Sequence, residues 1–299
     1  MTSLSDLKET GAVRCDVSLG SFTSYKVGGP AAFFAEVSSH EELLRLGEAW
    51  QGSPVEVLVI GRGSNLVISD RGFDGLVLRL RGEFFGIDHL PTKIRAGGAV
   101  PLPALARSAV AKGRLGLEFY VGIPGSVGGA IRQNAGGHGG ETKDWLRSVE
   151  VFDFRSGASS EKTIQDLGAS YRSTNIHSQQ VVMYAQFGFD EGDSEEGEER
   201  IREVIRWRKE HQPGGALNAG SVFKNPKGDS AGRIIDDLGL KGYSVGRVSV
   251  SDKHANFFVA EKGVTAQEVY ELVETVRDRV LQETGIRLEN EIQFVGKFS

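Results

Sequence analysis

The pattern of apolar and polar positions predicts alternating strands and helices over the first part of the chain. Apolar runs at 32–37, 55–60 and 76–80 are typical of strands, and the second is rich in β-branched residues, as a buried strand would be. Ser39 and Glu42 have the spacing of a capping box and precede a short leucine-rich helix. We therefore expect a small β-α-β lobe in residues 1–80.

The pattern becomes less regular after residue 81. Pro101 and Pro103 mark the start of a helix that Gly113 ends. Segments 149–154 and 181–189 read as strands with one solvated face, because apolar and polar residues alternate. These signals predict a second lobe, over residues 81–190, of the α+β type with antiparallel pairing.

An acidic stretch at 190–199 contains seven acidic residues and two glycines, and it indicates a solvated linker that runs into the first turn of a helix. We interpret it as the main domain boundary. Beyond it, helical spacing predicts one helix that ends near 211–213 and another that begins at a Thr265–Glu268 capping box and stops at Gly285. We expect a substrate-binding domain at 195–290, after which residues 291–299 return as a strand to the first lobe.

Composition excludes several classes of function. The chain has 299 residues, enough for two or three domains, and a formal net charge of −5, which disfavours nucleic-acid binding. Cys15 is the one cysteine, and the six histidines show no metal-ligand spacing. No apolar run approaches the length of a membrane span, and the first residues lack the core of a signal peptide. We expect a cytoplasmic protein without metal, nucleic-acid partner or membrane partner.

Glycine is the unusual residue type, with 40 in the chain. The segment 59–66 (VIGRGSNL) follows a predicted buried strand but lacks the third glycine of a dinucleotide fingerprint and the lysine of a P-loop. It suits either a structural turn or a nest of N–H groups for a pyrophosphate, with Ser64 and Asn65 as further donors.

A second glycine-rich segment, 122–140, contains eight glycines and almost no periodicity, which predicts an irregular loop rather than the interior of a helix or strand. Long irregular loops in compact domains are usually functional or disordered. The embedded apolar residues argue against disorder, so we favour ligand binding here.

Residues 218–226 (NAGSVFKNP) place one hydroxyl, that of Ser221, after a small flexible step and before an apolar pair. A serine alone more often caps a turn. The glycine loops indicate a phosphate-bearing cofactor, and Glu289 and Glu291 form a carboxylate pair near the end of the chain. Together they favour a serine that donates a proton over one that acts as a nucleophile.

Seven motifs (SYKVGGPA, GRGSNL, GIPGSVGGAIRQNAGG, SYRSTN, NAGSVFKNP, KHANFFVA and LENEIQFVG) stand in an order and at spacings that resemble the UDP-N-acetylenolpyruvoylglucosamine reductase family, over roughly residues 17–296. The resemblance implies an α+β fold, with a two-lobed FAD-binding module of the vanillyl-alcohol-oxidase (PCMH) type and a C-terminal α+β substrate domain. It is to the shorter form of the family, without the insertion for a tyrosine loop.

The resemblance also implies a reaction in peptidoglycan precursor synthesis. NADPH reduces FAD, and flavin N5 delivers hydride to the enolpyruvyl ether of UDP-N-acetylglucosamine, which gives UDP-N-acetylmuramate. Arg172 corresponds to the arginine that stabilises the developing enolate, although a lone arginine is more often in a surface ion pair. Ser221 corresponds to the proton donor, and Glu291 to a third catalytic residue, which we expect to be protonated because an anion there would repel the developing charge.

The family's binding residues map onto this chain in two sets. The cofactor set is Arg62, Gly63, Ser64, Asn65, Leu66, Gly122, Ile123, Gly125, Ser126, Gly128, Gly129, Asn134, Ala135, Gly136 and Arg208. The substrate set is Tyr171, Gln212, Asn225, Arg233, Lys253 and His254. Gln293 stands where the family usually has an arginine, so a charge near the flavin or substrate is missing.

Two alternatives remain. One is a flavoenzyme of the same fold that acts on another substrate, which is expected to lack the set of Arg172, Ser221 and Glu291. The other is a catalytically silent paralogue that binds flavin or sugar nucleotide. For its own assembly we expect a monomer or a weak oligomer.

Overall fold

The computed structural model describes residues 4–51, 53–215 and 217–299. By internal contacts the chain divides into two units, each made of three segments. Unit 1 contains Met1–Asp16, Phe33–Arg62 and Gly75–Arg206, and unit 2 contains Val17–Ala32, Gly63–Asp74 and Trp207–Ser299. The units interleave along the chain, whereas the three domains expected from the sequence follow one another; that three-part division stays a prediction.

The first part of unit 1 is built on a sheet and a helix. The sheet has the strand order β1-β2-β5-β3, in which β3 runs parallel to β5. The bounds are α1 (Leu4–Glu9), β1 (Val17–Ser18), β2 (Pro30–Val37), α2 (His40–Trp50), β3 (Val57–Val59) and β5 (Phe73–Leu80), and β1 and the first residues of β2 and β5 belong to unit 2. Ser39 caps α2 by accepting the N–H of Glu42 at 3.2 Å. The predicted strands and helix are confirmed, with bounds that differ by a few residues.

A five-stranded antiparallel sheet forms the centre of unit 1. Its order is β12-β11-β13-β7-β6. The strands are β6 (Ile87–Leu90), β7 (Lys93–Gly97), β11 (Leu146–Asp153), β12 (Ala158–Thr163) and β13 (Gln180–Phe187). The antiparallel pairing expected for this lobe is confirmed.

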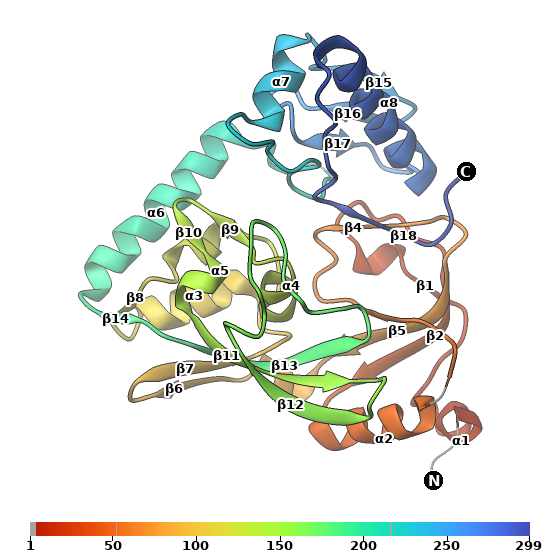
Figure 1. Cartoon of the computed structure of the whole chain (residues 1–299), viewed down its shortest axis with the longest axis vertical. Helices are drawn as coiled ribbons and strands as arrows, with labels where there is room; N and C mark the ends of the chain where they lie inside the picture. Colours follow the sequence, from red (N-terminus) through yellow and green to blue (C-terminus); the bar gives the residue numbers. More distant parts are fainter. Residues whose placement is uncertain (1–3, 52, 216) are drawn as a thin grey trace. The chain divides into compact units, whose positions relative to one another are not determined.

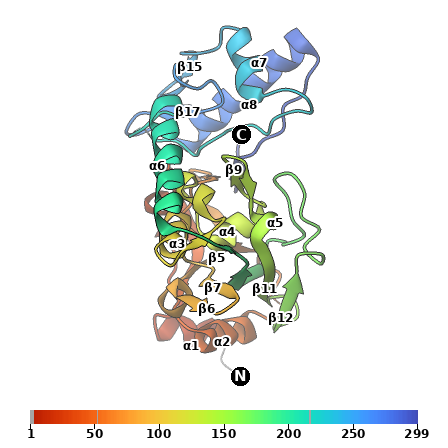
Figure 2. The same ribbon diagram turned by 90° about the vertical axis from the view of Figure 1, so that its left-hand side faces the viewer.

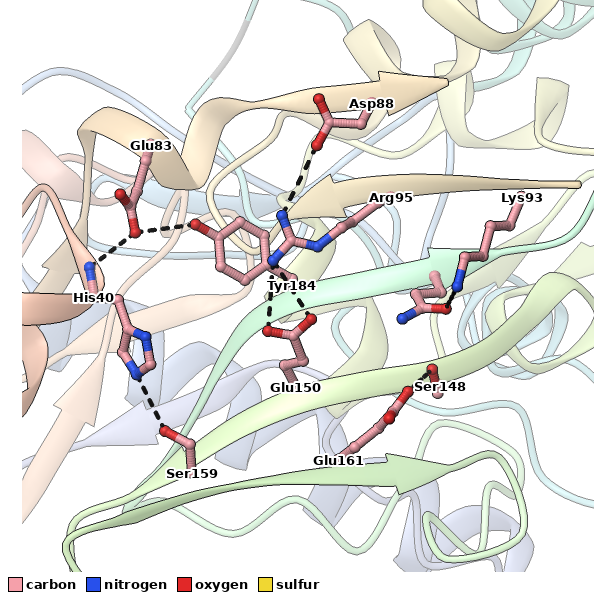
Figure 3. Close-up of polar contacts among 11 residues, drawn as sticks. His40, Glu83, Asp88, Lys93, Arg95, Ser148, Glu150, Ser159, Glu161 and Tyr184 are labelled. Atoms are coloured by element: carbon pink, nitrogen blue, oxygen red, sulfur yellow. Dashed lines mark hydrogen bonds and ion pairs between the residues drawn. The ribbon is translucent and has the colours of Figure 1, made fainter. Parts of the chain in front are cut away.

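One face of this sheet carries charged and polar side chains that pair across the strands (Figure 3). Arg95 lies 3.4 Å from Glu150 and 3.8 Å from Asp88, and its guanidinium is 3.5 Å from the centroid of the Tyr184 ring. The Tyr184 hydroxyl donates to Glu83 at 3.0 Å, and partial burial, with that carboxylate, raises the pKa of the phenol to about 12. Because these charges pair with one another, the face is best read as a solvated surface stabilised by cross-strand pairs.

Residues that alternate with these polar positions turn to the opposite face and form one of two hydrophobic cores in unit 1. Helices α3 (Leu102–Val110), α4 (Val127–Arg132) and α5 (Thr142–Trp145) accompany this part of the unit (Figure 2). The shorter elements are η2 (Gly82–Phe85), β8 (Arg114–Leu115), η3 (Glu118–Gly122), β9 (Gly136–Gly137), β10 (Gly140–Glu141) and β14 (Asp190–Glu191).

The expectation that 122–140 is irregular throughout is wrong, since α4 lies inside it. Val127, Ala130 and Ile131 have helical spacing and all three are buried. The two glycines within α4 hide this signal because glycine is a poor helix former. One of them, Gly128, is needed for close packing, since an added Cβ would lie 3.2 Å from the carbonyl oxygen of Gly98.

The acidic stretch leads into a long helix, α6 (Ser194–His211), whose last residues belong to unit 2. Its expected end near 211–213 is confirmed. Asp193 accepts the N–H of Glu195 at 2.9 Å, which satisfies one donor at the start of the helix. Among the described residues, no helix is long and apolar enough to span a membrane.

Unit 2 packs two helices around a core of its own (Figure 1). Its elements are η1 (Gly20–Phe22), β4 (Leu66–Ile68), α7 (Ala231–Asp237), β15 (Ser244–Val245), β16 (Val248–Val250), β17 (Phe258–Ala260), α8 (Ala266–Thr284) and β18 (Gln293–Val295). The predicted capping box of Thr265 and Glu268 starts α8, and Gly285 ends it with φ 73°. Asp70 adds a second cap, because its carboxylate accepts the first two N–H groups of α8 at 3.0 Å.

Candidate active site

Three motifs that lie far apart in the sequence meet in unit 2. The extended segment that contains Ser221 forms isolated β-bridges, on one side with the segment around Asn256 and on the other with the segment around Glu291. The N–H of Val222 donates to the carbonyl of Asn256 at 2.9 Å, and the carbonyl of Val222 accepts the N–H of Glu291 at 2.8 Å. A main-chain hydrogen bond thus holds Glu291 beside Val222, the residue that directly follows Ser221.

Asn256 reinforces this arrangement with its side chain. The amide is buried, with Nδ2 donating to the carbonyl of Phe223 at 2.8 Å and Oδ1 accepting the N–H of Phe223 at 2.9 Å. One side chain therefore takes the place of a missing strand partner. Sequence reasoning missed this residue, although an amide inside the apolar run HANFFV is a signal that could have found it.

Gly220 directly precedes Ser221, and its backbone conformation sets the direction in which the chain enters this segment. Its φ is 76°, and an added Cβ would meet no atom within 4 Å. The position therefore needs glycine for its backbone conformation and not for space.

The predicted cofactor residues 63–66 lie beside Glu291 in unit 2. Asn65 donates its side-chain amide to the carbonyl of Glu291 at 2.8 Å, and its own carbonyl accepts the N–H of Gln293 at 2.9 Å. Gly63 has φ 60°, and an added Cβ would lie 1.9 Å from the carbonyl oxygen of Phe22. The chain's own packing therefore requires this glycine, whatever ligand the loop binds.

Two predicted substrate residues, Asn225 and His254, also lie in unit 2. Asn225 accepts the N–H of Ala231 at 3.0 Å through its side chain. His254 accepts the N–H of Asn256 on Nδ1 at 3.1 Å. Burial is the main cause that lowers the pKa of His254, and the charge of Lys241 acts in the same direction. A neutral imidazole that accepts on Nδ1 carries its hydrogen on Nε2, so His254 can donate a hydrogen bond.

Four more predicted binding residues of unit 2 are engaged with neighbours. Lys253 donates to the carbonyl of Lys209 at 2.5 Å, and Arg208 donates to the side chain of Gln212 at 2.9 Å. Partial burial lowers the pKa of Arg208. Arg233 forms ion pairs with two aspartates, one before and one within its own helix, α7. A substrate contact by Arg233 would compete with those pairs and stays a prediction.

The third predicted catalytic residue, Arg172, belongs to unit 1. It occupies a two-residue turn with φ 52°, and its Nη2 donates to the carbonyl of Gly136 at 2.9 Å. The neighbouring Tyr171 is 44% exposed, with its ring centroid 5.0 Å from the guanidinium carbon of Arg172. A non-glycine residue at positive φ is strained, and such strain is common at functional sites.

Asn134, predicted as a cofactor residue, has its side chain bonded within the protein. It is fully buried, and its amide donates to Glu141 at 3.1 Å and to the carbonyl of Ser170 at 2.9 Å. Its Oδ1 accepts the N–H of Lys143 at 2.9 Å. The side chain thus connects parts of the protein, and a contact of Asn134 with the cofactor stays a prediction.

The first part of the loop 122–129 packs against the end of the buried strand. An added Cβ on Gly61 would lie 2.2 Å from Oγ of Ser126, and Gly125 accepts the N–H of Leu102 at 3.0 Å. Next to it lies a pocket of about 380 Å³ lined by Arg62, Pro101, Pro103, Ala104, Arg107 and Pro124. The other predicted cofactor residues of unit 1 are Gly122, Ile123, Gly128, Gly129, Ala135 and Gly136.

These features fit a phosphate-bearing cofactor. The pocket has two guanidinium groups and no carboxylate among its lining residues, which suits an anion. Arg107 was not predicted from the sequence, because a helix surface commonly carries a lone arginine.

A fold with these loops belongs to the class of flavin-binding proteins: residues 30–159 match the model of the FAD binding domain. The α+β fold class is confirmed. Residues 212–295 match a second model, described as the C-terminal domain of UDP-N-acetylenolpyruvoylglucosamine reductase.

Individual proteins extend this likeness over nearly the whole chain. UDP-N-acetylenolpyruvoylglucosamine reductase 2 of Symbiobacterium thermophilum is 40% identical over 97% of this chain and 94% of its own. The reductase of Rubrobacter xylanophilus is 39% identical over 96% of each chain. The crystal structure of the enzyme from Thermus caldophilus is similar with a TM-score of 0.83 at 38% identity, and it covers 95% of this chain and 100% of its own.

The chain therefore belongs to the UDP-N-acetylenolpyruvoylglucosamine reductase family. It is a flavin-dependent oxidoreductase with FAD as cofactor, and its substrate is the sugar nucleotide that gives the family its name.

Proposed function

We propose that this chain uses NADPH to reduce the enolpyruvyl ether of UDP-N-acetylglucosamine to a lactyl ether. The observation that supports the proposal most is that the N–H of Glu291 donates to the carbonyl of Val222, the residue directly after Ser221, so that the main chains of the two predicted catalytic residues lie side by side. FAD, when bound, accepts a hydride from NADPH and supplies one from N5 to the terminal alkene carbon of the substrate.

The remaining chemistry is assigned to the protein's own side chains. Addition of hydride leaves negative charge on the adjacent carbon, delocalised into the substrate carboxylate. The guanidinium of Arg172 stabilises this charge, because it is always protonated and matches a carboxylate in geometry. Ser221 Oγ donates the proton that completes the lactyl group, and a weak acid is suited to this because the enolate is a strong base. We assign a protonated carboxyl group to Glu291, because a carboxylate there would repel the negative charge of the enolate.

Binding of the sugar nucleotide is assigned mainly to unit 2. Lys253 carries a charge that suits a diphosphate, and His254, which is neutral near pH 7, offers its Nε2 hydrogen. Asn225 and His254 contact adjoining residues. Asn225 accepts the N–H of Ala231, and a Cβ added to the next residue, Gly232, would lie 3.1 Å from Cε1 of His254. Tyr171 is assigned to the same substrate through its exposed ring.

Two half-reactions followed separately by stopped-flow absorbance test the proposal. Anaerobic mixing with NADPH should bleach the flavin, and mixing of the reduced protein with the enolpyruvyl sugar nucleotide should restore its colour. A protein that binds the sugar nucleotide but does not reoxidise its flavin would be the silent paralogue. Reoxidation by another enol ether or carbonyl compound alone would favour a related flavoenzyme.

Ser221→Ala separates the roles of the residues. We expect the reoxidation by substrate to slow by about 100- to 10,000-fold, the usual contribution of a general acid, with flavin reduction by NADPH unchanged. Ser249→Ala, on β16 of the same unit, is the matched control and should leave both steps unchanged. Equal loss of both steps in Ser221→Ala would contradict a role as proton donor.

A further inference from the structure

We propose that Glu141 is a positioning residue for Arg172, acting through the Asn134 amide and across Gly136. The inference rests on the proposed function, because it concerns the step in which Arg172 stabilises the enolate. It adds a residue outside the predicted catalytic and binding sets.

The first link runs through Asn134. Oε2 of Glu141 accepts from Nδ2 of Asn134 at 3.1 Å, and the same Nδ2 donates to the carbonyl of Ser170 at 2.9 Å. Ser170 and Ser173 exchange two main-chain hydrogen bonds, at 3.0 and 3.2 Å, that close the turn of Tyr171 and Arg172. Because Asn134 is fully buried, a change in its orientation would move the base of this turn.

The second link runs across Gly136, which pairs with Glu141 in the β9–β10 hairpin. The carbonyl of Gly136 accepts from Nη2 of Arg172 at 2.9 Å. A Cβ built on Gly136 would lie 2.8 Å from Cγ of Glu141 and 3.2 Å from Nη1 of Arg172, so the two side chains lie against the same glycine. The side chains of Glu141 and Arg172 are therefore neighbours across Gly136, which has no side chain to separate them.

Electrostatics agree with this geometry. The hydrogen bond from Lys143 is the largest cause that lowers the pKa of Glu141, and the Asn134 amide and the charges of Lys143 and Arg172 act in the same direction. The carboxylate is therefore ionised at neutral pH. Lys143 pairs with this carboxylate from the solvent side, at 2.7 Å.

The reason to fix Arg172 from several sides is conformational. Its backbone is in the left-handed region, which a non-glycine residue keeps only when its surroundings determine it. The negative charge that Arg172 stabilises exists only in the transition state. A flexible arginine stabilises it less well, because each alternative rotamer places the guanidinium away from that charge. Glu141 is itself fixed, because it caps α5 in a capping box with Asp144.

The test compares Glu141→Ala and Glu141→Gln in the FAD-loaded protein. For Glu141→Ala we expect reoxidation by the enolpyruvyl substrate to slow by about 10- to 100-fold, as small misplacements do, with flavin reduction by NADPH within about twofold of wild type. Glu141→Gln keeps an oxygen that can accept from Asn134 and should recover most of the rate. Lys143→Met, which removes only the exposed partner, is the control and should behave as wild type.

A double-mutant cycle with Arg172→Lys shows whether Glu141 acts through Arg172. In the Arg172→Lys background, Glu141→Ala should cost less than about threefold, since coupled residues are not additive. Calorimetry with the oxidised protein should show a smaller change in the dissociation constant of the substrate than in the rate.

Three results would overturn the inference. Additive losses in the cycle would mean that Glu141 acts independently of Arg172. Equal losses of both half-reactions, together with a lower melting temperature or FAD content, would mean a structural role only. A Glu141→Ala protein as fast as wild type would mean no role. A wild-type protein that fails to reoxidise would instead refute the proposed function, and the inference with it.

Discussion

The two regions that carry the predicted catalytic residues are held in different ways. In unit 2, Ser221 and Glu291 lie on segments joined by main-chain hydrogen bonds, next to a hydrophobic core. In unit 1, two main-chain bonds close the turn of Arg172, but the bonds that join this turn to neighbouring segments come from the side chains of Asn134, itself bonded to Glu141, and of Arg172. Main-chain bonds do not depend on the identity of the side chain, whereas these connecting bonds in unit 1 do.

This difference has a consequence for substitution. Most side-chain substitutions near Ser221 should alter the rate of the reaction without moving this segment of main chain. The reason is that the segment is hydrogen-bonded mainly to backbone groups of its neighbours. Replacements near Arg172 should alter placement even when they do not touch substrate. The contrast is sharpest at the two asparagines, Asn256 and Asn134, each buried and each bonded to main-chain groups of a neighbouring segment.

The largest effect is expected at Asn256, whose side chain bonds to both main-chain groups of Phe223 in the segment that contains Ser221. Asn256→Leu keeps the volume but leaves the N–H and carbonyl of Phe223 without their partner. Each buried group left in this way costs about 1–3 kcal/mol, so the free energy of unfolding should fall by about 2–6 kcal/mol. Urea denaturation of purified protein measures it.

Asn175→Ala provides the control, because that exposed amide bonds to the carbonyl of Asp166 at 3.4 Å. It should change the free energy of unfolding by less than about 0.5 kcal/mol. If Asn256→Leu changed the free energy of unfolding as little as Asn175→Ala, the main-chain bonds alone would hold the segment that contains Ser221. The contrast between this region and the side-chain bonds around Arg172 would then be even stronger than we infer.

A smaller effect is expected at Gly61 in unit 1, where packing and not hydrogen bonding sets the geometry. Gly61→Ala puts a Cβ 2.2 Å from Oγ of Ser126, and overpacking of this kind costs about 1–3 kcal/mol. The FAD content after purification should fall, as flavin absorbance per protein would show. Addition of Ser126→Ala leaves a milder 3.2 Å contact and should restore part of it.

Gly137→Ala is the matched control for that substitution, because an added Cβ there meets no atom within 4 Å. It should keep the FAD content of wild type. Equal losses in Gly61→Ala and Gly137→Ala would mean that backbone freedom, and not close packing, explains the glycines of this unit.

Local signals in the sequence were sufficient where an element is determined by its own residues. The helix α8 begins and ends as its capping box and Gly285 predict. The cap that Asp70 adds was not predictable, because it comes from almost 200 positions earlier in the chain. The helix α4 was missed for the same kind of reason: its glycines look like loop residues, and only the structure shows that Gly98 lies against one of them, Gly128.

The candidate site was predictable residue by residue but not as an arrangement. The motifs around Ser221, Asn256 and Glu291 were recognised separately, and nothing in their local pattern gives the pairing that brings them together. Asn134 illustrates the opposite limit. A motif suggested a cofactor contact, whereas the hydrogen bonds of its side chain go to the protein.

The smallest expected effect is the dependence of the free energy of unfolding on pH, and it concerns His254 in unit 2. Burial lowers the pKa of His254 in the folded protein below the ordinary value of 6.5, so the unfolded chain binds a proton more readily. The free energy of unfolding should therefore fall as pH drops below about 6.5, and His254→Gln should reduce this slope. Urea midpoints at pH 7.5 and 5.5 for both proteins measure it. His89, whose pKa is also lowered by burial, leaves a residual slope in the variant. If both proteins lost the same stability between these pH values, protonation of His254 would not be coupled to folding.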